Sequence, residues 1–306
     1  MKKLSLLLAL ALSLTLHAQQ PGLEFGDEFW AHWGDGKAEL SGYDLKMPRY
    51  GEVRDGTAAL IFVTEPFTVE PRVKADGPNA RTGTVFQVMK LNLIRDFPTG
   101  IYDYNTMSSV FVGLEPFAGL PAGSPAKVTF SSQEWCGQVW EQATYHPETI
   151  DVVSHSYFGG EADQAFTIER GGDLWTEDQL FHWARGFALP DPERESAEVR
   201  MLPTLLEARL SHDPLEPRRV RLRRSVGHER IEVPAGTFET TIHEAESTER
   251  TWRFWVETDH PHRIVQWRVS TGERGRLRGS ERLPYWEMNK SKYEEALSEI
   301  GLGTGE

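Results

Sequence analysis

The sequence predicts a mainly β protein: a long, curved antiparallel sheet in the form of a half-barrel, with one or two short helices packed against it. Three observations predict this class. Apolar and polar residues alternate over several stretches, turn-forming residues separate these stretches, and helical spacing of apolar residues is rare. The alternating stretches are residues 84–94, 218–226, 251–257 and 263–270.

Each alternating stretch has one apolar side. In residues 251–257, Trp252, Phe254 and Val256 alternate with Arg253 and Glu257. Because successive side chains of a strand point to opposite faces, each stretch predicts one buried face and one solvated face. The apolar positions of the other stretches are Val85, Met89, Leu91, Leu93, Val220, Leu222, Val226, Val265, Trp267 and Val269.

Turn and helix signals complete the predicted fold. Asp-Gly, Pro-x-Gly and similar sequences adopt turn dihedral angles easily. They predict turns at residues 54–56, 234–236 and 258–261. Thr176 and Gln179 have the spacing of a capping box, and the predicted helix ends before Pro190. Its apolar face is Leu180, Trp183, Ala184 and Phe187.

The N-terminus predicts export. Lys2 and Lys3 precede an apolar run at residues 4–16, which is shorter than the roughly 20 residues that span a bilayer. A small residue, Ala18, then suits cleavage, so residues 1–18 are a predicted signal peptide and the protein a periplasmic or secreted one. A retained membrane anchor is the alternative. The mature chain has no predicted transmembrane segment; residues 19–288 form one β-rich domain, and residues 289–306 form a flexible tail that can include a short helix.

Charge and cysteine content narrow the functional classes. Losing Lys2 and Lys3 with the signal peptide changes the formal net charge from −13 to −15. An acidic surface repels phosphate groups, which disfavours nucleic-acid partners and peripheral membrane docking. The single cysteine, Cys136, excludes a disulfide within the chain, so burial of a core must hold the fold together.

Catalytic and metal sites have weak signals. Cys136 is a candidate reactive thiol, with His146 or His155 as its base, or else a small thiol in a strand beside a glycine. Paired carboxylates such as Glu161 and Asp163 are candidates for acid–base work. The candidate metal ligands His155, His243, His260 and His262, with Glu161 or Glu244, lack the spacing of a zinc motif. We therefore expect no catalytic residue, metal or cofactor.

The aromatic residues give a better functional signal. A curved sheet with one apolar concave face can hold an acyl chain or another apolar ligand. The residues that we predict to line it are Trp135, Trp140, Trp252, Phe254, Trp255 and Trp267. Packing in an ordinary core is the alternative role for each of them.

The C-terminal half resembles a known periplasmic domain. Residues 231–240 read Ile-Glu-Val-Pro-Ala-Gly-Thr-Phe-Glu-Thr, and residues 252–256 and 260–265 follow as further strands. Over residues 218–270 this order resembles a periplasmic domain of unknown function. The resemblance implies a curved antiparallel sheet similar in shape to the half-barrels of lipoprotein carriers.

The N-terminal half resembles a second group. Residues 29–33, 48–52, 61–65 and 131–137 resemble an uncharacterised exported bacterial family. Its members are sometimes labelled septum formation inhibitor Maf. The nucleotide pyrophosphatases of that name have a basic, Ser-rich phosphate loop near the start, and this sequence has a signal peptide there instead.

These observations predict an exported envelope protein, more a binding protein than an enzyme. It would bind a lipid or other hydrophobic ligand, or an envelope protein partner, on the concave face of its sheet. Two alternatives come from other classes: a hydrolase acting on an envelope polymer, and a structural or assembly protein without a ligand.

Overall fold

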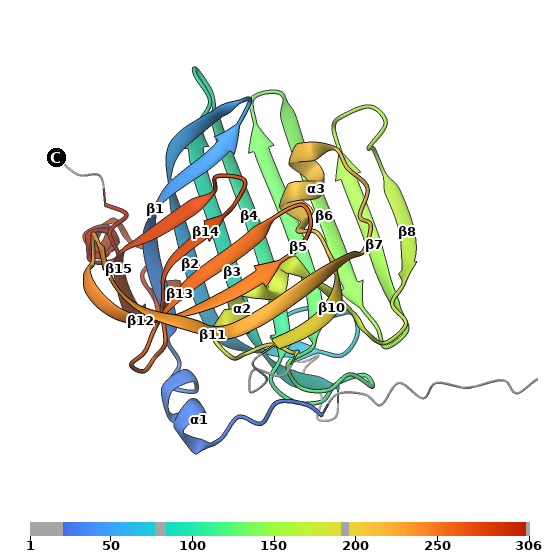
Figure 1. Cartoon of the computed structure of the whole chain (residues 1–306), viewed down its shortest axis with the longest axis horizontal. Coiled ribbons are helices and arrows are strands. Elements are labelled where there is room, and N and C mark those ends of the chain that lie inside the picture. The colour runs from blue at the N-terminus through green and yellow to red at the C-terminus, as the bar shows by residue number, and fades with distance from the viewer. Residues whose placement is uncertain (1–20, 77–83, 191–195, 304–306) are drawn as a thin grey trace, which may run out of the picture.

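The computed structural model describes residues 21–76, 84–190 and 196–303. Within these ranges fifteen strands form one sheet, so the predicted mainly β class with short helices is confirmed (Figure 1). The predicted signal peptide lies outside the described residues. The strands are β1 (Ala38–Arg49), β2 (Glu52–Thr68), β3 (Val85–Pro98), β4 (Asp103–Gly113), β5 (Pro125–Glu134), β6 (Gly137–Tyr145), β7 (Thr149–Ser156), β8 (Gln164–Glu169), β9 (Leu174–Thr176), β10 (Ser196–Leu202), β11 (Arg218–Val233), β12 (Gly236–Glu246), β13 (Thr251–Glu257), β14 (Ile264–Val269) and β15 (Arg274–Leu283). The α-helices are α1 (Asp27–Trp33), α2 (Leu180–Ala184), α3 (Leu205–Ser211) and α4 (Ala296–Glu299), and the 3-10 helices are η2 (Glu177–Gln179), η3 (Tyr285–Glu287) and η4 (Ser291–Tyr293).

The sheet consists of two meanders joined edge to edge. Strands β1 to β8 form the first leaf and β9 to β15 the second, and the pairing of β1 with β15 joins them. The second leaf lies across the first (Figure 1). Every pair is antiparallel except β9 with β10, which the sequence did not predict. The chain enters the second leaf at β9, and a parallel pair needs a crossover connection of the kind that α2 provides between β9 and β10.

Helix α2 fills the middle of the space between the leaves. All its side chains are buried, and the Phe181 ring lies 5.2–6.1 Å from the rings of Trp252, Phe254 and Trp267. The helical segment starts where the sequence predicts, because the Thr176 hydroxyl accepts a hydrogen bond from the Asp178 amide. It ends earlier than predicted, since Gly186 takes a φ of 80° and leaves Phe187 outside the helix. The predicted concave face therefore exists, but a helix occupies its centre.

Two local predictions are wrong. Residues 54–56 lie inside β2, and the chain turns instead at Tyr50 and Gly51. Their φ angles of 55° and 78° are those of a type I′ hairpin turn. Val226 is exposed rather than buried, because the β11–β12 register shifts between Arg223 and Gly227. The other predicted turns, at 234–236 and 258–261, are confirmed.

The two ends of the first leaf differ. The turns β1–β2, β3–β4, β5–β6 and β7–β8 lie together at what we call the open end, at the top of Figure 1. The turns between β4 and β5 and between β6 and β7, and the described residues of the β2–β3 connection, lie at the opposite, closed end. There the Leu23 amide donates to the Ala122 carbonyl oxygen (3.1 Å) and the Leu189 amide to that of Gly123 (2.9 Å). Segments preceding β1 and following α2 thus cover the closed end.

The C-terminal residues pack on the outside of the β1–β15 junction. Helices η4 and α4 lie within the predicted tail, and Ile300 is buried with Ala38, Leu40 and Val63. None of the helices in the described ranges is long and apolar enough to cross a membrane.

Candidate functional site

A cleft of about 350 Å³ lies between the two leaves at the open end. Its walls are the last residues of β1 with the β1–β2 turn, helix α3, and the turns that precede β13 and follow β14. The apolar lining is Met47, Pro48, Leu206, Leu210, Trp252 and Val269. The polar lining is Arg49, Tyr50, Thr204, Glu207, Ser211, Arg250, Thr271 and Glu273.

Helix α3 is held in place by its N-terminal hydrogen bonds. The Thr204 hydroxyl accepts from the Glu207 amide (3.1 Å), and the Asp178 carboxylate accepts from the Leu205 amide (3.2 Å). Burial raises the pKa of Asp178 to about 6. Because Asp178 lies in η2, this carboxylate links α3 to the buried segment between the leaves. The link directs Leu206 toward the cleft.

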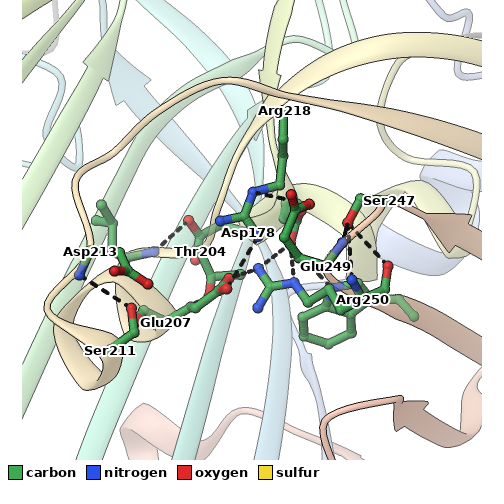
Figure 2. A network of polar contacts seen from close by, with 12 residues as sticks. Asp178, Thr204, Glu207, Ser211, Asp213, Arg218, Ser247, Glu249 and Arg250 are labelled. Carbon is green, nitrogen blue, oxygen red and sulfur yellow. Dashed lines mark hydrogen bonds and ion pairs between the residues drawn. The ribbon is translucent and has the colours of Figure 1, made fainter.

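Most charges of the cleft are paired. Arg250 contacts both Glu177, at 2.8 Å from Nε, and Glu207. Arg218 also reaches Glu207, at 3.2 Å, and Figure 2 shows these groups converging beside α3. Glu273 accepts hydrogen bonds from Arg95 at 2.9 and 3.0 Å. The two lining carboxylates and Arg250 therefore have partners of opposite charge.

Arg49 is different. Its Nη1 donates to the Leu210 carbonyl oxygen (3.0 Å), and its Nη2 donates to the hydroxyls of Tyr104 (3.1 Å) and Tyr50 (3.3 Å). The guanidinium carbon lies 4.2 Å from the centre of the Tyr50 ring, and the buried Nε has no partner. Among the described residues no carboxylate lies within ion-pair distance of it. Because its partners are all neutral, Arg49 gives the cleft wall a positive charge without a counter-charge. A half-buried cation is more stable when an anion compensates its charge.

A second groove, of about 440 Å³, lies on the outside of the molecule beside α4. Its apolar lining includes Leu40, Leu283, Tyr285 and Leu297. It is separate from the space between the leaves, where the sequence predicts a ligand.

The structure brings together three of the six predicted lining residues. Trp252, Phe254 and Trp267 surround Phe181, and of these only Trp252 lines the cleft. The Trp267 Nε1 donates to the carboxylate of Glu273, which lines the cleft, at 3.0 Å. The Trp267 ring therefore helps to hold this lining residue in place.

The other three predicted residues lie elsewhere. Trp255 is on the opposite face of β13, where its Nε1 donates to Glu229 (2.8 Å) and the guanidinium groups of Arg253 and Arg268 cover its ring. Trp140 lies on the outer face of β6 and stacks on His155. Trp135 projects into solvent from the β5–β6 turn.

The candidate catalytic and metal residues are dispersed. Cys136 is exposed in the β5–β6 turn, and a hydrogen bond with Glu134 raises the pKa of its thiol, which keeps the thiol protonated and a weak nucleophile. Glu161 and Asp163 bond to different histidines, His212 (2.5 Å) and His155 (2.8 Å). In the described part of the chain no three His, Cys, Asp or Glu side chains are grouped so as to hold a metal.

Sequence reasoning missed α3 and Arg49. Thr204 and Glu207 have the spacing of a capping box, and Leu205, Leu206 and Leu210 follow at helical spacing, so a signal for α3 was present. The residues next to Arg49 in the sequence give no signal for its role, because that role depends on groups from distant parts of the chain that face it.

Known proteins give no guide to this cleft. No protein-family model, curated protein or solved structure matches the chain. The two resemblances described above therefore stay predictions.

Proposed function

We propose that this protein is an exported envelope protein that binds an amphipathic acid in the cleft: an apolar small molecule with one carboxylate or similar anionic group. The observation that carries the proposal is Arg49, a half-buried cation with only neutral partners, at the edge of an apolar wall. The volume of the cleft falls within the range of about 300–1,000 Å³ that is usual for small-molecule sites.

Two interactions would bind such a ligand. Its chain would lie against Leu206, Trp252 and Val269, and burial of each methylene contributes about 0.8 kcal/mol. Its acidic group would accept hydrogen bonds from the Arg49 guanidinium, and a bond between charged groups contributes about 1.5–3 kcal/mol. Tyr50 and Tyr104 support the guanidinium from the side.

The test compares an acid with its ester. Delipidated protein is titrated with cis-parinaric acid, a fluorescent fatty acid, and with its methyl ester. Leu210→Trp fills the cleft and should weaken both ligands by about tenfold or more. Arg49→Gln should weaken the acid by about tenfold and leave the ester unchanged.

Two control variants match these changes. Leu297→Trp fills the outer groove instead of the cleft, and Arg54→Gln removes a nearby cation that is already paired with Glu52 (2.8 Å). Both should bind the acid as the parent does. The proposal is wrong if neither probe binds, or if Leu297→Trp weakens binding while Leu210→Trp does not.

A further inference from the structure

Each of the four turns at the open end presents a large apolar side chain to solvent. These side chains are Tyr50 in β1–β2, Ile101 in β3–β4, Trp135 in β5–β6 and Tyr157 in β7–β8, and they are 56%, 85%, 74% and 74% exposed. We call these four residues the rim. Single exposed apolar residues are ordinary on a protein surface, but a row of them along one edge indicates a contact surface.

Neighbouring residues connect three of the four rim side chains. The hydroxyls of Tyr50 and Tyr104 are 2.7 Å apart, and the Tyr102 ring lies 6.0 Å from Tyr104 and 6.4 Å from Trp135. On the other side of Trp135, the Tyr157 ring packs so closely on Gly137 that a Cβ atom there would lie 2.6 Å from it. Aromatic contacts thus extend from the first turn to the third, and Tyr157 of the fourth turn packs on the first residue of β6.

The rim also meets the cleft. Tyr50 belongs to both, and its φ of 55°, which the type I′ turn requires, is uncommon for a residue other than glycine. This backbone conformation places the Tyr50 side chain beside Arg49, where the cleft opens.

We propose that the rim docks on the surface of a zwitterionic lipid bilayer, and that ligand passes between bilayer and cleft beside Tyr50. The passage of ligand rests on the proposed function, whereas the docking does not. Tyrosine and tryptophan have an apolar ring with a polar atom at its edge, which suits the boundary between lipid chains and head groups.

Charge selects the kind of bilayer. Glu52, Asp103 and Glu134 flank the rim, and the whole chain is acidic, so anionic head groups would be repelled. The net charge argues against docking on anionic membranes, but it does not oppose contact between uncharged rim side chains and zwitterionic lipid. Because charges more than about 8 Å away are largely screened at physiological salt, this repulsion comes mainly from the carboxylates that flank the rim.

The single cysteine provides a probe at the rim. Cys136 is exposed next to Trp135, so an environment-sensitive dye such as NBD can be attached there in protein recovered from cells expressing the full chain. With phosphatidylcholine–phosphatidylethanolamine vesicles, we expect the dye emission to rise and to be quenched by spin-labelled lipid. A dye on Cys136→Ser/Glu148→Cys, in the β6–β7 turn at the closed end, should not respond.

Rim variants test the side chains themselves. Ile101→Ser/Trp135→Ser/Tyr157→Ser should lower partitioning into these vesicles by about tenfold or more. A matched triple, Phe166→Ser/Trp286→Ser/Leu297→Ser, removes exposed apolar side chains away from the rim and should partition as the parent does. Replacing part of the phosphatidylcholine with phosphatidylglycerol should weaken binding.

Other outcomes overturn docking. No change at the Cys136 dye, an equal response at the closed end, or binding to anionic vesicles alone would each exclude it, and the first would leave a protein partner as the occupant of the rim. Because parinaric acid binding needs no vesicles, the two proposals fail separately. Vesicle docking without acid binding would refute only the proposed function, and acid binding without docking would refute only this inference.

Discussion

Strand β1 has an arginine–carboxylate pair at one end and an arginine without a carboxylate at the other. At the closed end, Glu39 receives two hydrogen bonds from Arg185 (2.5 and 3.0 Å), and both side chains are buried. At the open end, Arg49 has hydroxyl and carbonyl partners only. The fold balances the buried charge of Arg185 with Glu39. At Arg49 an unbalanced charge borders a cleft, and from the two features together we infer a place for a ligand.

Aromatic side chains show the same contrast. At the closed end Phe86 stacks on Phe117 with ring centres 4.2 Å apart, and both are buried. At the open end Trp135 and Tyr157 project into solvent. The first leaf has turns at both ends, but among the described residues chain segments cover only one of them, so coverage rather than residue type decides which aromatic side chains are buried.

The largest expected effect tests the two ends of β1. Glu39→Gln leaves Arg185 buried without a counter-charge and should lower the free energy of unfolding by about 3–5 kcal/mol. Arg49→Gln should lower it less, by about 1–2 kcal/mol, because it loses hydrogen bonds to neutral acceptors but no ion pair. Urea unfolding measures both. If Arg49→Gln lowers the free energy of unfolding as much as Glu39→Gln does, Arg49 has a structural role and the two ends of β1 do not differ in the way described.

The second effect depends on pH. Burial raises the pKa of Glu141, on β6, to about 7; Ser154 donates to one of its oxygens (3.2 Å) and the other has no partner. Because the folded state holds this proton more tightly than the unfolded chain, the contribution of Glu141 to stability is greatest below about pH 4.5 and is lost as the pH rises through about 7. The fall should be about 2–3 kcal/mol.

Glu141→Gln keeps the acceptor for Ser154 and has no proton to lose. Its unfolding free energy should exceed that of the parent at pH 8, and the difference should shrink at pH 4.5. Glu169→Gln, at an exposed position on β8, is the control and should follow the parent. Parallel pH profiles for parent and Glu141→Gln would show that Glu141 ionises normally.

A smaller effect separates stability from binding at Tyr50. Tyr50→Asn places a residue that favours the type I′ turn at a φ of 55°, and it should stabilise the fold by up to about 1 kcal/mol. The same change removes the ring and hydroxyl beside Arg49, so parinaric acid should bind more weakly. Thermal unfolding measures the stability and titration measures the binding of parinaric acid. If Tyr50→Asn lowers both, the Tyr50 side chain stabilises the fold and the prediction is wrong.

The smallest effect concerns the thiol at the rim. Glu134 raises the pKa of Cys136, so its alkylation should need a higher pH than that of a free cysteine. Glu134→Gln should speed alkylation a few-fold at pH 8, and Glu148→Gln at the closed end should not. Fast alkylation of the parent at neutral pH would revive the nucleophile hypothesis.

Much of the secondary structure was predictable, because alternation is a local property of the chain. Trp252, Phe254 and Trp267 are buried as the period of two predicts. The burial of two residues differs from what this alternation predicts. Val226 is exposed because it lies within the register shift between β11 and β12. Trp255 is buried although it lies on the outer face, because arginines of β13 and β14 cover its ring.

What the sequence by itself determined was thus the class of fold, the faces of most strands and the start of the helical segment at η2. Only the tertiary structure decided the cleft, because it needs the β1–β2 turn beside the β14–β15 turn, where Pro48 and Gly272 approach each other. It also decided which charges are paired, as in Arg95 with Glu273. Alternation follows from the geometry of neighbouring residues, whereas a cleft and its unbalanced charge arise from strands that are far apart in the chain.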